Sequence, residues 1–159
     1  MSNDAVRVRA GSAADFAAVL LLERETAEAP HWSEAEYRSI VETAGGIRRC
    51  IFVAAVGERV VGFSVGKAVG SGVEGVGELE SVAVAGAARR RGLGRALCEA
   101  VVEWCRDEGV GEVELEVRAG SGGAIAMYLG LGFTAVGRRR GYYRDPVDDA
   151  LLMRLKLEG

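Results

Sequence analysis

The run of residues with the clearest chemical capability is RRRGLGR, at positions 89–95. It follows an apolar stretch and opens the longest helix that the sequence predicts. The glycines at positions 92 and 94 let the backbone approach a ligand closely, and a helix N-terminus offers unpaired N–H groups with a partial positive charge. The arginines can add charge-assisted hydrogen bonds to phosphate oxygens. The run therefore predicts an anion site suited to a pyrophosphate.

Other interpretations of this run differ in what they require. A dinucleotide-binding loop needs a third glycine and a position after the first strand, and the run has neither. A P-loop needs a Gly-Lys-Ser/Thr end, which the run lacks. A tight strand-to-helix turn with a solvated basic run needs only the residues present. It therefore stays open as the alternative to the anion site.

Cysteine, histidine and metal chemistry receive less support. Cys50, Cys98 and Cys105 show no C-x-x-C spacing, so neither a disulfide framework nor a metal site is expected. Cys98 and Cys105 fall on the predicted long helix, at positions more typical of a core residue than of a nucleophile. His31 is the only histidine, and we interpret it as a loop residue rather than a base.

The predicted elements alternate between helical and strand periodicity, which indicates an α/β domain with a mixed sheet. The long helix carries one apolar stripe. Helices are expected at 12–26, 33–44, 92–108 and 121–131. Strands are expected at 6–9, 50–56, 60–67, 78–84, 111–117, 133–138 and 150–157, with a glycine-rich loop at 70–77 and a basic loop at 85–91.

Composition excludes several classes of protein. The 159 residues are 49% hydrophobic, which predicts one folded domain over residues 1–159. The net charge of −3 argues against a direct nucleic-acid binder. The sequence has no apolar run of about 18 residues and no basic start before an apolar run, so we expect no membrane span and no signal peptide. We therefore expect a soluble, cytoplasmic protein.

Three elements, in this order, resemble the acyl-CoA-binding layout of the GNAT acetyltransferases. The run at 89–94 is similar to the signature Q/R-x-x-G-x-G/A, LESVAV at 79–84 to the fourth strand, and AIAMYLGLGF at 124–133 to a later A-x-x-x-Y-x-x-x-G-F element. WSE at 32–34, LEVRA at 115–119 and RRGYY at 139–143 resemble the RimI family, the ribosomal protein N-terminal alanine acetyltransferases. The resemblance implies the GNAT fold, a mixed central β-sheet flanked by about four helices.

The resemblance also implies acetyl-CoA as the acyl donor. A bulge in the family's fourth strand frees backbone N–H groups, so Val82 or Ala83 is expected to stabilise the oxyanion. Pantetheine is expected to pair with the edge of that strand like an added strand. The residues that the resemblance assigns to acetyl-CoA binding are Val82, Ala83, Val84, Arg89, Arg90, Arg91, Gly92, Leu93, Gly94, Arg95, Ser121 and Tyr128.

Three carboxylates compete for the role of general base. The RimI resemblance assigns it to Glu116, whereas other GNAT enzymes place theirs on the cofactor strand, where Glu78 and Glu80 lie. Alternation puts Glu112 and Glu114 on the same face as Glu116, so an exposed acidic stripe is the competing structural interpretation.

The remaining site residues are also assigned by resemblance. Tyr128 falls at the family position of the acid that protonates the leaving thiolate, and a core tyrosine is its alternative. Tyr142 and Tyr143 are expected to line the groove for the acceptor, with Trp32 closing it and Glu80 contacting the acceptor. The alternative for Tyr142 and Tyr143 is an ordinary pair of strand residues. The alternative for Trp32 is a hydrophobic staple at the start of a helix.

The chemistry of the acceptor limits how strong the base must be. Near pH 7.5 about a quarter of protein α-amines are neutral, against about one lysine in a thousand. Making a lysine equally neutral costs roughly 3 kcal/mol more. An enzyme for α-amines can therefore work with a modest base that acts through water.

These features predict an enzyme that transfers an acetyl group from acetyl-CoA to a protein N-terminal α-amine by direct attack. The expected partner is the N-terminal peptide of a protein such as a ribosomal protein, and the expected state is a monomer or weak homodimer. An acetyltransferase of a small-molecule amine is the second hypothesis. A non-catalytic acyl-CoA-binding sensor is the third, and it would not need Glu116 and Tyr128.

Overall fold

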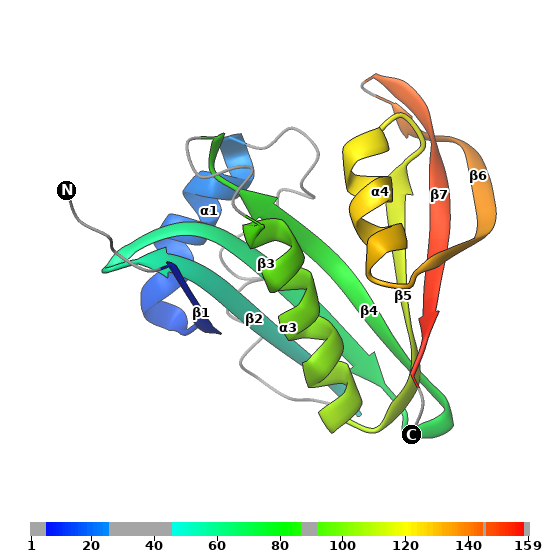
Figure 1. Ribbon diagram of the computed structural model, residues 1–159, viewed down its shortest axis with the longest axis horizontal. Helices are drawn as coiled ribbons and strands as arrows, with labels where there is room; N and C mark the ends of the chain where they lie inside the picture. Colours follow the sequence, from blue (N-terminus) through cyan, green and yellow to red (C-terminus); the bar gives the residue numbers. More distant parts are fainter. Residues whose placement is uncertain (1–5, 26–45, 87–91, 145, 158–159) are drawn as a thin grey trace.

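The computed structural model describes residues 6–25, 46–86, 92–144 and 146–157 of the chain. Its described strands form one sheet in the order β1-β2-β3-β4-β5-β7-β6 (Figure 1). Only β4 and β5 pair in parallel, so the sheet is mixed. The strands are β1 (Val6–Ala10), β2 (Ile47–Val56), β3 (Arg59–Val69), β4 (Gly72–Val84), β5 (Val110–Arg118), β6 (Thr134–Arg144) and β7 (Val147–Lys156).

Helices cover both faces of this sheet (Figure 1). The described residues contain α1 (Phe16–Glu25), which a short 3-10 turn precedes, α3 (Leu93–Asp107) and α4 (Gly122–Gly130). Alternation along β2 separates the faces, because Ile51 and Val53 pack with α1 whereas Cys50 and Phe52 pack with α3. The fourth expected helix, at 33–44, lies outside the described residues.

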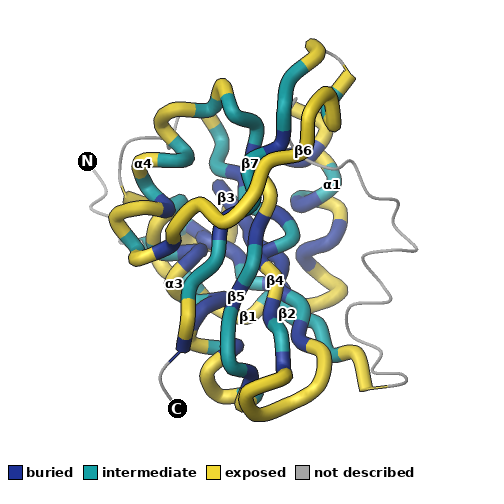
Figure 2. The backbone as a smooth tube through the Cα atoms, turned by 90° about the vertical axis from the view of Figure 1, so that its right-hand side faces the viewer, coloured by how far each residue is buried: buried dark blue, intermediate teal, exposed yellow. Residues whose placement is uncertain are grey.

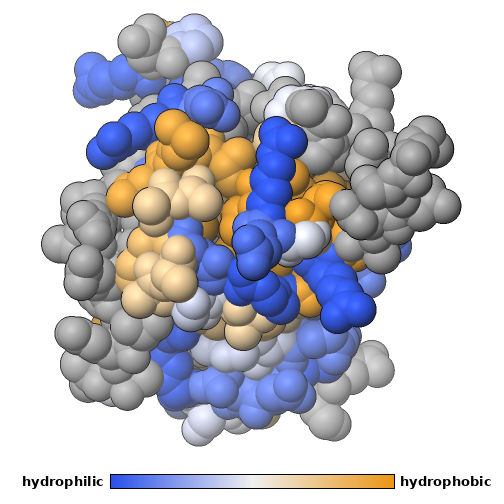
Figure 3. All heavy atoms as spheres, turned by 90° about the vertical axis from the view of Figure 1, so that its left-hand side faces the viewer, coloured by the Kyte–Doolittle hydropathy of each residue, from blue (hydrophilic) through white to orange (hydrophobic). Residues whose placement is uncertain are grey.

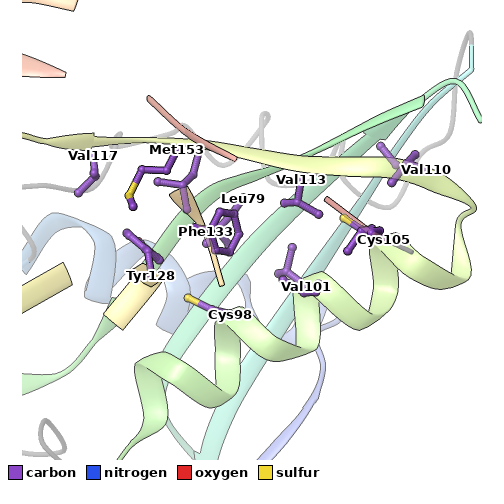
Figure 4. Close-up of a cluster of buried hydrophobic side chains, with 14 residues drawn as sticks. Leu79, Cys98, Val101, Cys105, Val110, Val113, Val117, Tyr128, Phe133 and Met153 are labelled. Atoms are coloured by element: carbon purple, nitrogen blue, oxygen red, sulfur yellow. The ribbon is translucent and has the colours of Figure 1, made fainter. Parts of the chain in front are cut away.

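The largest core cluster fills the space between the sheet and the two helices α3 and α4. Figure 4 shows Val117, Tyr128 and Met153 at one end of this cluster, and Val110 and Cys105 at the other. The apolar stripe predicted for the long helix is confirmed, since one face of α3 is buried here. The cluster thereby fixes α3 and α4 against β4 and β5, the strands that carry the predicted site.

The two edges of the sheet are protected by charge. At one edge, β6 is exposed along nearly its whole length and carries several arginines (Figure 2). At the other edge, exposed Arg7 and Arg9 alternate with Val6 and Val8 on β1. Figure 3, which views the molecule from that side, shows apolar areas separated by hydrophilic side chains. Charged edge strands disfavour pairing with another sheet.

Some predicted boundaries were wrong. The segment 70–77 was expected to be a loop, but β4 begins at Gly72. Residues 139–144 and 147–149 were expected to be loop, but β6 continues to Arg144 and β7 begins at Val147. Tyr142 and Tyr143 therefore lie in a strand.

Candidate active site

The candidate site is a cleft between β4 and β5, at the point where the two strands separate. Their parallel pairing runs from Gly72 and Val110 to Glu78 and Glu114 and then stops. Beyond this point lies a cavity of about 140 Å³. Its lining residues are Leu79, Glu80, Ser81, Val82, Glu116, Val117, Arg118, Ser121, Ala124, Met127, Tyr128 and Tyr143.

A β-bulge in β4 lies at the mouth of this cleft. Ser81 pairs with Val65 and Leu79 pairs with Gly66, so Glu80 has no residue opposite it in β3. The bulge expected from the family resemblance is therefore present. It makes β4 bend at the position where β5 leaves it.

The direction of backbone groups after the bulge follows from one hydrogen bond. Ala85 N–H donates to the carbonyl oxygen of Val61 on β3, at 2.8 Å. Successive residues of a strand direct their N–H groups to opposite sides, so Ala83 also faces β3. Val82 instead directs its N–H toward the gap between β4 and β5. Of the two expected oxyanion donors, Val82 has the suitable direction.

The cleft passes through the sheet, because its lining comes from both faces. Val117 belongs to the core cluster on the α3 and α4 face, together with Tyr128. Glu116 lies on the opposite face, where its carboxylate is 3.5 Å from Arg139 Nη2. A ligand on one face can therefore meet a ligand on the other face inside the cleft.

The two best-placed ionisable side chains differ in exposure. Tyr128 is 6% exposed, and its ring packs edge-on against Phe133 with centroids 6.0 Å apart. The side chain of Glu116 is 29% exposed, so water can reach its carboxylate. The structure thus brings the expected acid and base to one cleft. Tyr128, the expected acid, is buried there, and Glu116, the expected base, is more exposed to solvent.

The two carboxylates of β4 are placed differently from each other. Glu80 lines the cleft, is 12% exposed in its side chain, and pairs with Arg49 Nε at 3.1 Å. Glu78 lies instead in a neighbouring cavity with Glu114 and Glu116. Desolvation, followed by repulsion from Glu80, raises the pKa of Glu78, although the residue is largely exposed and solvent weakens the effect.

The expected acidic stripe on β5 is present and is neutralised by arginine. Arg154 on β7 pairs with Glu112 at 3.3 Å and with Glu114 at 2.9 Å. Glu116 and Arg139 complete the row. The stripe interpretation and the base interpretation therefore coexist, because Glu116 is the member of the row that also lines the cleft.

Arg118 contacts Tyr143 and the loop before β7 beside the cleft. Its guanidinium lies 4.3 Å from the centroid of the Tyr143 ring, and its Nη1 donates to the carbonyl oxygen of Pro146 at 2.8 Å. Burial, followed by the charge of Glu116, raises the pKa of Tyr143. Tyr143 lines the cleft, whereas Tyr142 is half-exposed and packs edge-on against it.

The expected phosphate end lies at the start of α3. Gly92 is the residue before the helix and has φ of +72°, a left-handed conformation that favours glycine. A Cβ on Gly94 would lie 3.4 Å from Met127 Sδ on α4, so only a small residue fits there without displacing its neighbour. Leu93 is buried, and exposed Arg95 pairs with Glu99 at 3.1 Å. The backbone here fits the predicted anion site.

The remaining predicted residues are placed as follows. Val84 continues β4 beyond the cleft lining, and Ser121 precedes α4 and lines the cleft. Arg89, Arg90, Arg91, Trp32 and His31 lie outside the described residues.

Thiol and metal chemistry receive no support in the described part of the chain. Burial raises the pKa of Cys98 and of Cys105 to about 12, which keeps both as thiols. Burial likewise raises the pKa of Cys50. The described residues contain no group of side chains able to hold a metal ion.

No described helix is long and apolar enough to cross a membrane.

Sequence reasoning missed three contributors to the site. The sequence marks Arg118 only as a member of a family motif, Ser81 only as a strand residue, and Met127 only as a helix residue. Their roles depend on contacts between β4, β5, α4 and β6, which are distant in the sequence. Ser81 is one of two polar residues in LESVAV, next to Glu80, and a polar pair in a strand predicted to be largely buried was the signal that could have pointed to it.

Comparisons with known proteins agree with this geometry. The model of the acetyltransferase (GNAT) family matches residues 17–133. The [ribosomal protein bS18]-alanine N-acetyltransferase of Escherichia coli K12 is 44% identical over 71 residues, 43% of this chain and 48% of that protein. The mycothiol acetyltransferase of a Nocardioides species is 43% identical over 86 residues, 49% of this chain and 29% of that protein. The chain thus spans less than half the length of these curated relatives.

A solved structure extends the similarity to the whole fold. The crystal structure of the ribosomal-protein-S18-alanine N-acetyltransferase from Escherichia coli superposes with a TM-score of 0.79 at 29% identity, over 98% of this chain and 97% of that chain. The GNAT fold and family expected from the sequence are confirmed.

Proposed function

Because the chain belongs to the acetyltransferase (GNAT) family, we propose that it transfers an acetyl group from acetyl-CoA to the N-terminal α-amine of a protein. The observation that carries the proposal is the cleft through the sheet, which has Tyr128 on one face and Glu116 on the other. The name of the Escherichia coli relative supports an N-terminal alanine of a ribosomal protein as the acceptor. A cytoplasmic location stays a prediction.

Acetyl-CoA occupies the face covered by α3 and α4. Gly92 and Gly94 let backbone N–H groups at the start of α3 approach the pyrophosphate, and Arg95 adds positive charge nearby. The edge of β4 after the bulge, at Val82 and Val84, pairs with the pantetheine. Ser121 and Met127 border the thioester end of the site.

The acceptor enters from the opposite face, past Tyr143. Its neutral amine nitrogen attacks the thioester carbon, and the N–H of Val82 stabilises the negative charge that develops on the carbonyl oxygen. A water between the amine and Glu116 carries the amine proton to the carboxylate. The C–S bond then breaks, Tyr128 gives its proton to the leaving sulfur, and solvent protons restore the phenol.

The absence of a suitable thiol supports direct attack. A route through an acetylated cysteine needs a thiolate in the cleft, and none of the described cleft-lining residues is a cysteine. The cysteines of α3 are fully buried with pKa values near 12.

A panel of acceptors tests the function. Purified enzyme is mixed with acetyl-CoA and with peptides beginning with Ala, Ser or Met, a peptide with a blocked N-terminus and an internal lysine, and several small amines. We expect the highest kcat/KM for the peptide beginning with Ala and at least tenfold less for the blocked peptide. Mass spectrometry of the product locates the acetyl group. Turnover of small amines with no peptide reaction would contradict the N-terminal assignment.

Acetylation of a small-molecule amine is the second candidate. The similarity to a mycothiol acetyltransferase favours it, because that relative's name refers to mycothiol and not to a protein. The same cleft and the same acid and base serve either reaction. The acceptor panel separates the two candidates.

A further inference from the structure

Ser81 is a buried polar residue whose hydroxyl group has no visible task in the fold. It is 7% exposed, and its Oγ has no hydrogen-bond partner in the part of the chain that the structure describes. Ser64, which is also buried, donates from its Oγ to the carbonyl oxygen of Leu97 at 3.0 Å. A buried hydroxyl without a partner costs stability, so its presence calls for another explanation.

Two features connect Ser81 with the acceptor. It follows the bulged residue Glu80 and lines the cleft with Tyr128 and Glu116. Ala83, two residues further along β4, packs with the cluster of α1, so alternation places Ser81 on the same face. That is the face of Glu116, from which the acceptor enters. Ser81 thus lies on the β4 wall of the cleft, and Glu116 lies on the β5 wall.

We propose that Ser81 Oγ accepts a hydrogen bond from the acceptor amine and orients it for attack. The inference rests on the proposed acetyl transfer and adds a substrate contact that the acid and base do not supply. A neutral amine has two N–H groups and one lone pair. If Ser81 holds one N–H and the water beside Glu116 holds the other, the lone pair is left to face the thioester carbon. Serine turns readily among its staggered rotamers, so the hydroxyl can follow the ligand.

The test uses Ser81→Ala, which removes the hydroxyl, and Ser81→Cys, which replaces the hydroxyl by a somewhat larger thiol that forms only weak hydrogen bonds. Both variants should lower kcat/KM for the peptide beginning with Ala by about 2- to 12-fold, the effect of one neutral hydrogen bond. Acetyl-CoA affinity by calorimetry should not change. The urea midpoint of Ser81→Ala should stay the same or rise, because no partnered group is lost.

Ser64→Ala is the matched control, since it removes a buried serine hydroxyl of the neighbouring strand that does have a partner. It should lower the urea midpoint and leave kcat/KM within twofold of wild type. Wild-type kcat/KM in Ser81→Ala would overturn the inference. A lower midpoint together with weaker acetyl-CoA binding would also overturn it, because Ser81 would then support the fold.

The outcomes also separate this inference from the proposed function. If the wild-type enzyme acetylates no peptide but acetylates a small amine, the N-terminal assignment fails. The Ser81 comparison is then made on that amine, where an unchanged kcat/KM contradicts the inference and a 2- to 12-fold loss supports it.

Discussion

Replacing Glu116 by Gln is the most informative perturbation of the site, because it keeps the shape of the side chain and removes its ability to accept a proton. The change should leave the fold intact. Glu116 is paired with Arg139, which is more than half exposed, and such pairs contribute about 0.2–1 kcal/mol. A loss of turnover should therefore reflect chemistry and not unfolding.

The expected loss of kcat/KM at pH 7 is about 10²- to 10⁴-fold, the usual contribution of a general base. Part of it should return at higher pH. With an α-amine pKa of about 8, roughly a tenth of the acceptor is neutral at pH 7 and roughly nine tenths at pH 9. The kcat/KM of the variant should therefore rise by up to about tenfold between these pH values, which recovers part of the activity that it lacks at pH 7.

The assay follows the free thiol of CoA from pH 7 to pH 9 with a peptide beginning with Ala. Glu80→Gln is the matched control, because Glu80 lines the same cleft from β4. Its ion pair with Arg49 is more buried, so this variant should lose about 1–3 kcal/mol of stability, the cost of leaving a hydrogen-bonding partner unsatisfied, and keep more activity than Glu116→Gln. Near wild-type rates for Glu116→Gln, together with an inactive and still folded Glu80→Gln, would refute the assignment and move the base to β4.

Three further predictions test the other parts of the proposed mechanism. Tyr128→Phe should lower kcat by about 10²- to 10⁴-fold without changing acetyl-CoA affinity, and raising the pH should not restore kcat. Full activity in this variant would exclude the phenol as the acid. Gly94→Glu should abolish acetyl-CoA binding in calorimetry, while Gly94→Ala binds. Because the longer side chain must displace Met127, a thermal melt checks that the Glu variant is folded, and unchanged affinity in that variant would place the pyrophosphate elsewhere. Cys98→Ala and Cys105→Ala should keep kcat/KM within a few-fold of wild type, and a folded but inactive variant that still binds acetyl-CoA would point to a covalent route.

The parts of the fold that sequence reasoning predicted well are those with local signals. The glycine at the start of the long helix is an example, since its positive φ is a property of that one residue. The apolar stripe of α3 is another example, because the helical spacing of its apolar residues can be recognised within four turns of sequence. Glu116 and Tyr128 were found through family motifs, and the structure places both at the cleft.

The parts that were missed depend on contacts between distant segments. The glycines of 72–77 look like a loop in the sequence, but a Cβ on Gly77 would lie 2.6 Å from Cys105 Sγ of α3. Glycine is needed there because a strand lies close under a helix. The predicted strands of the β6 and β7 hairpin were too short, because the residues that extend them, 139–144 and 147–149, are mostly polar and little buried. Cross-strand pairs such as Arg138 with Asp149, at 2.7 Å, help hold the hairpin together.

The tight packing at Gly77 also helps to fix the geometry of the gap between β4 and β5 in the middle of the sheet. β4 and β5 are paired up to Glu78 and Glu114, and this paired end is packed against α3 by Val113 and Cys105, which are fully buried (Figure 4). Close-packed interiors transmit displacements, so the angle at which the strands part is fixed at the paired end. A larger residue at position 77 would press on Cys105 and push α3 away from β4. The proposed anion site lies at the start of α3, so a change in the core below the cleft would shift it relative to Val82. We infer that these apolar contacts hold the proposed pyrophosphate site and the proposed oxyanion donor in register, although they touch neither ligand.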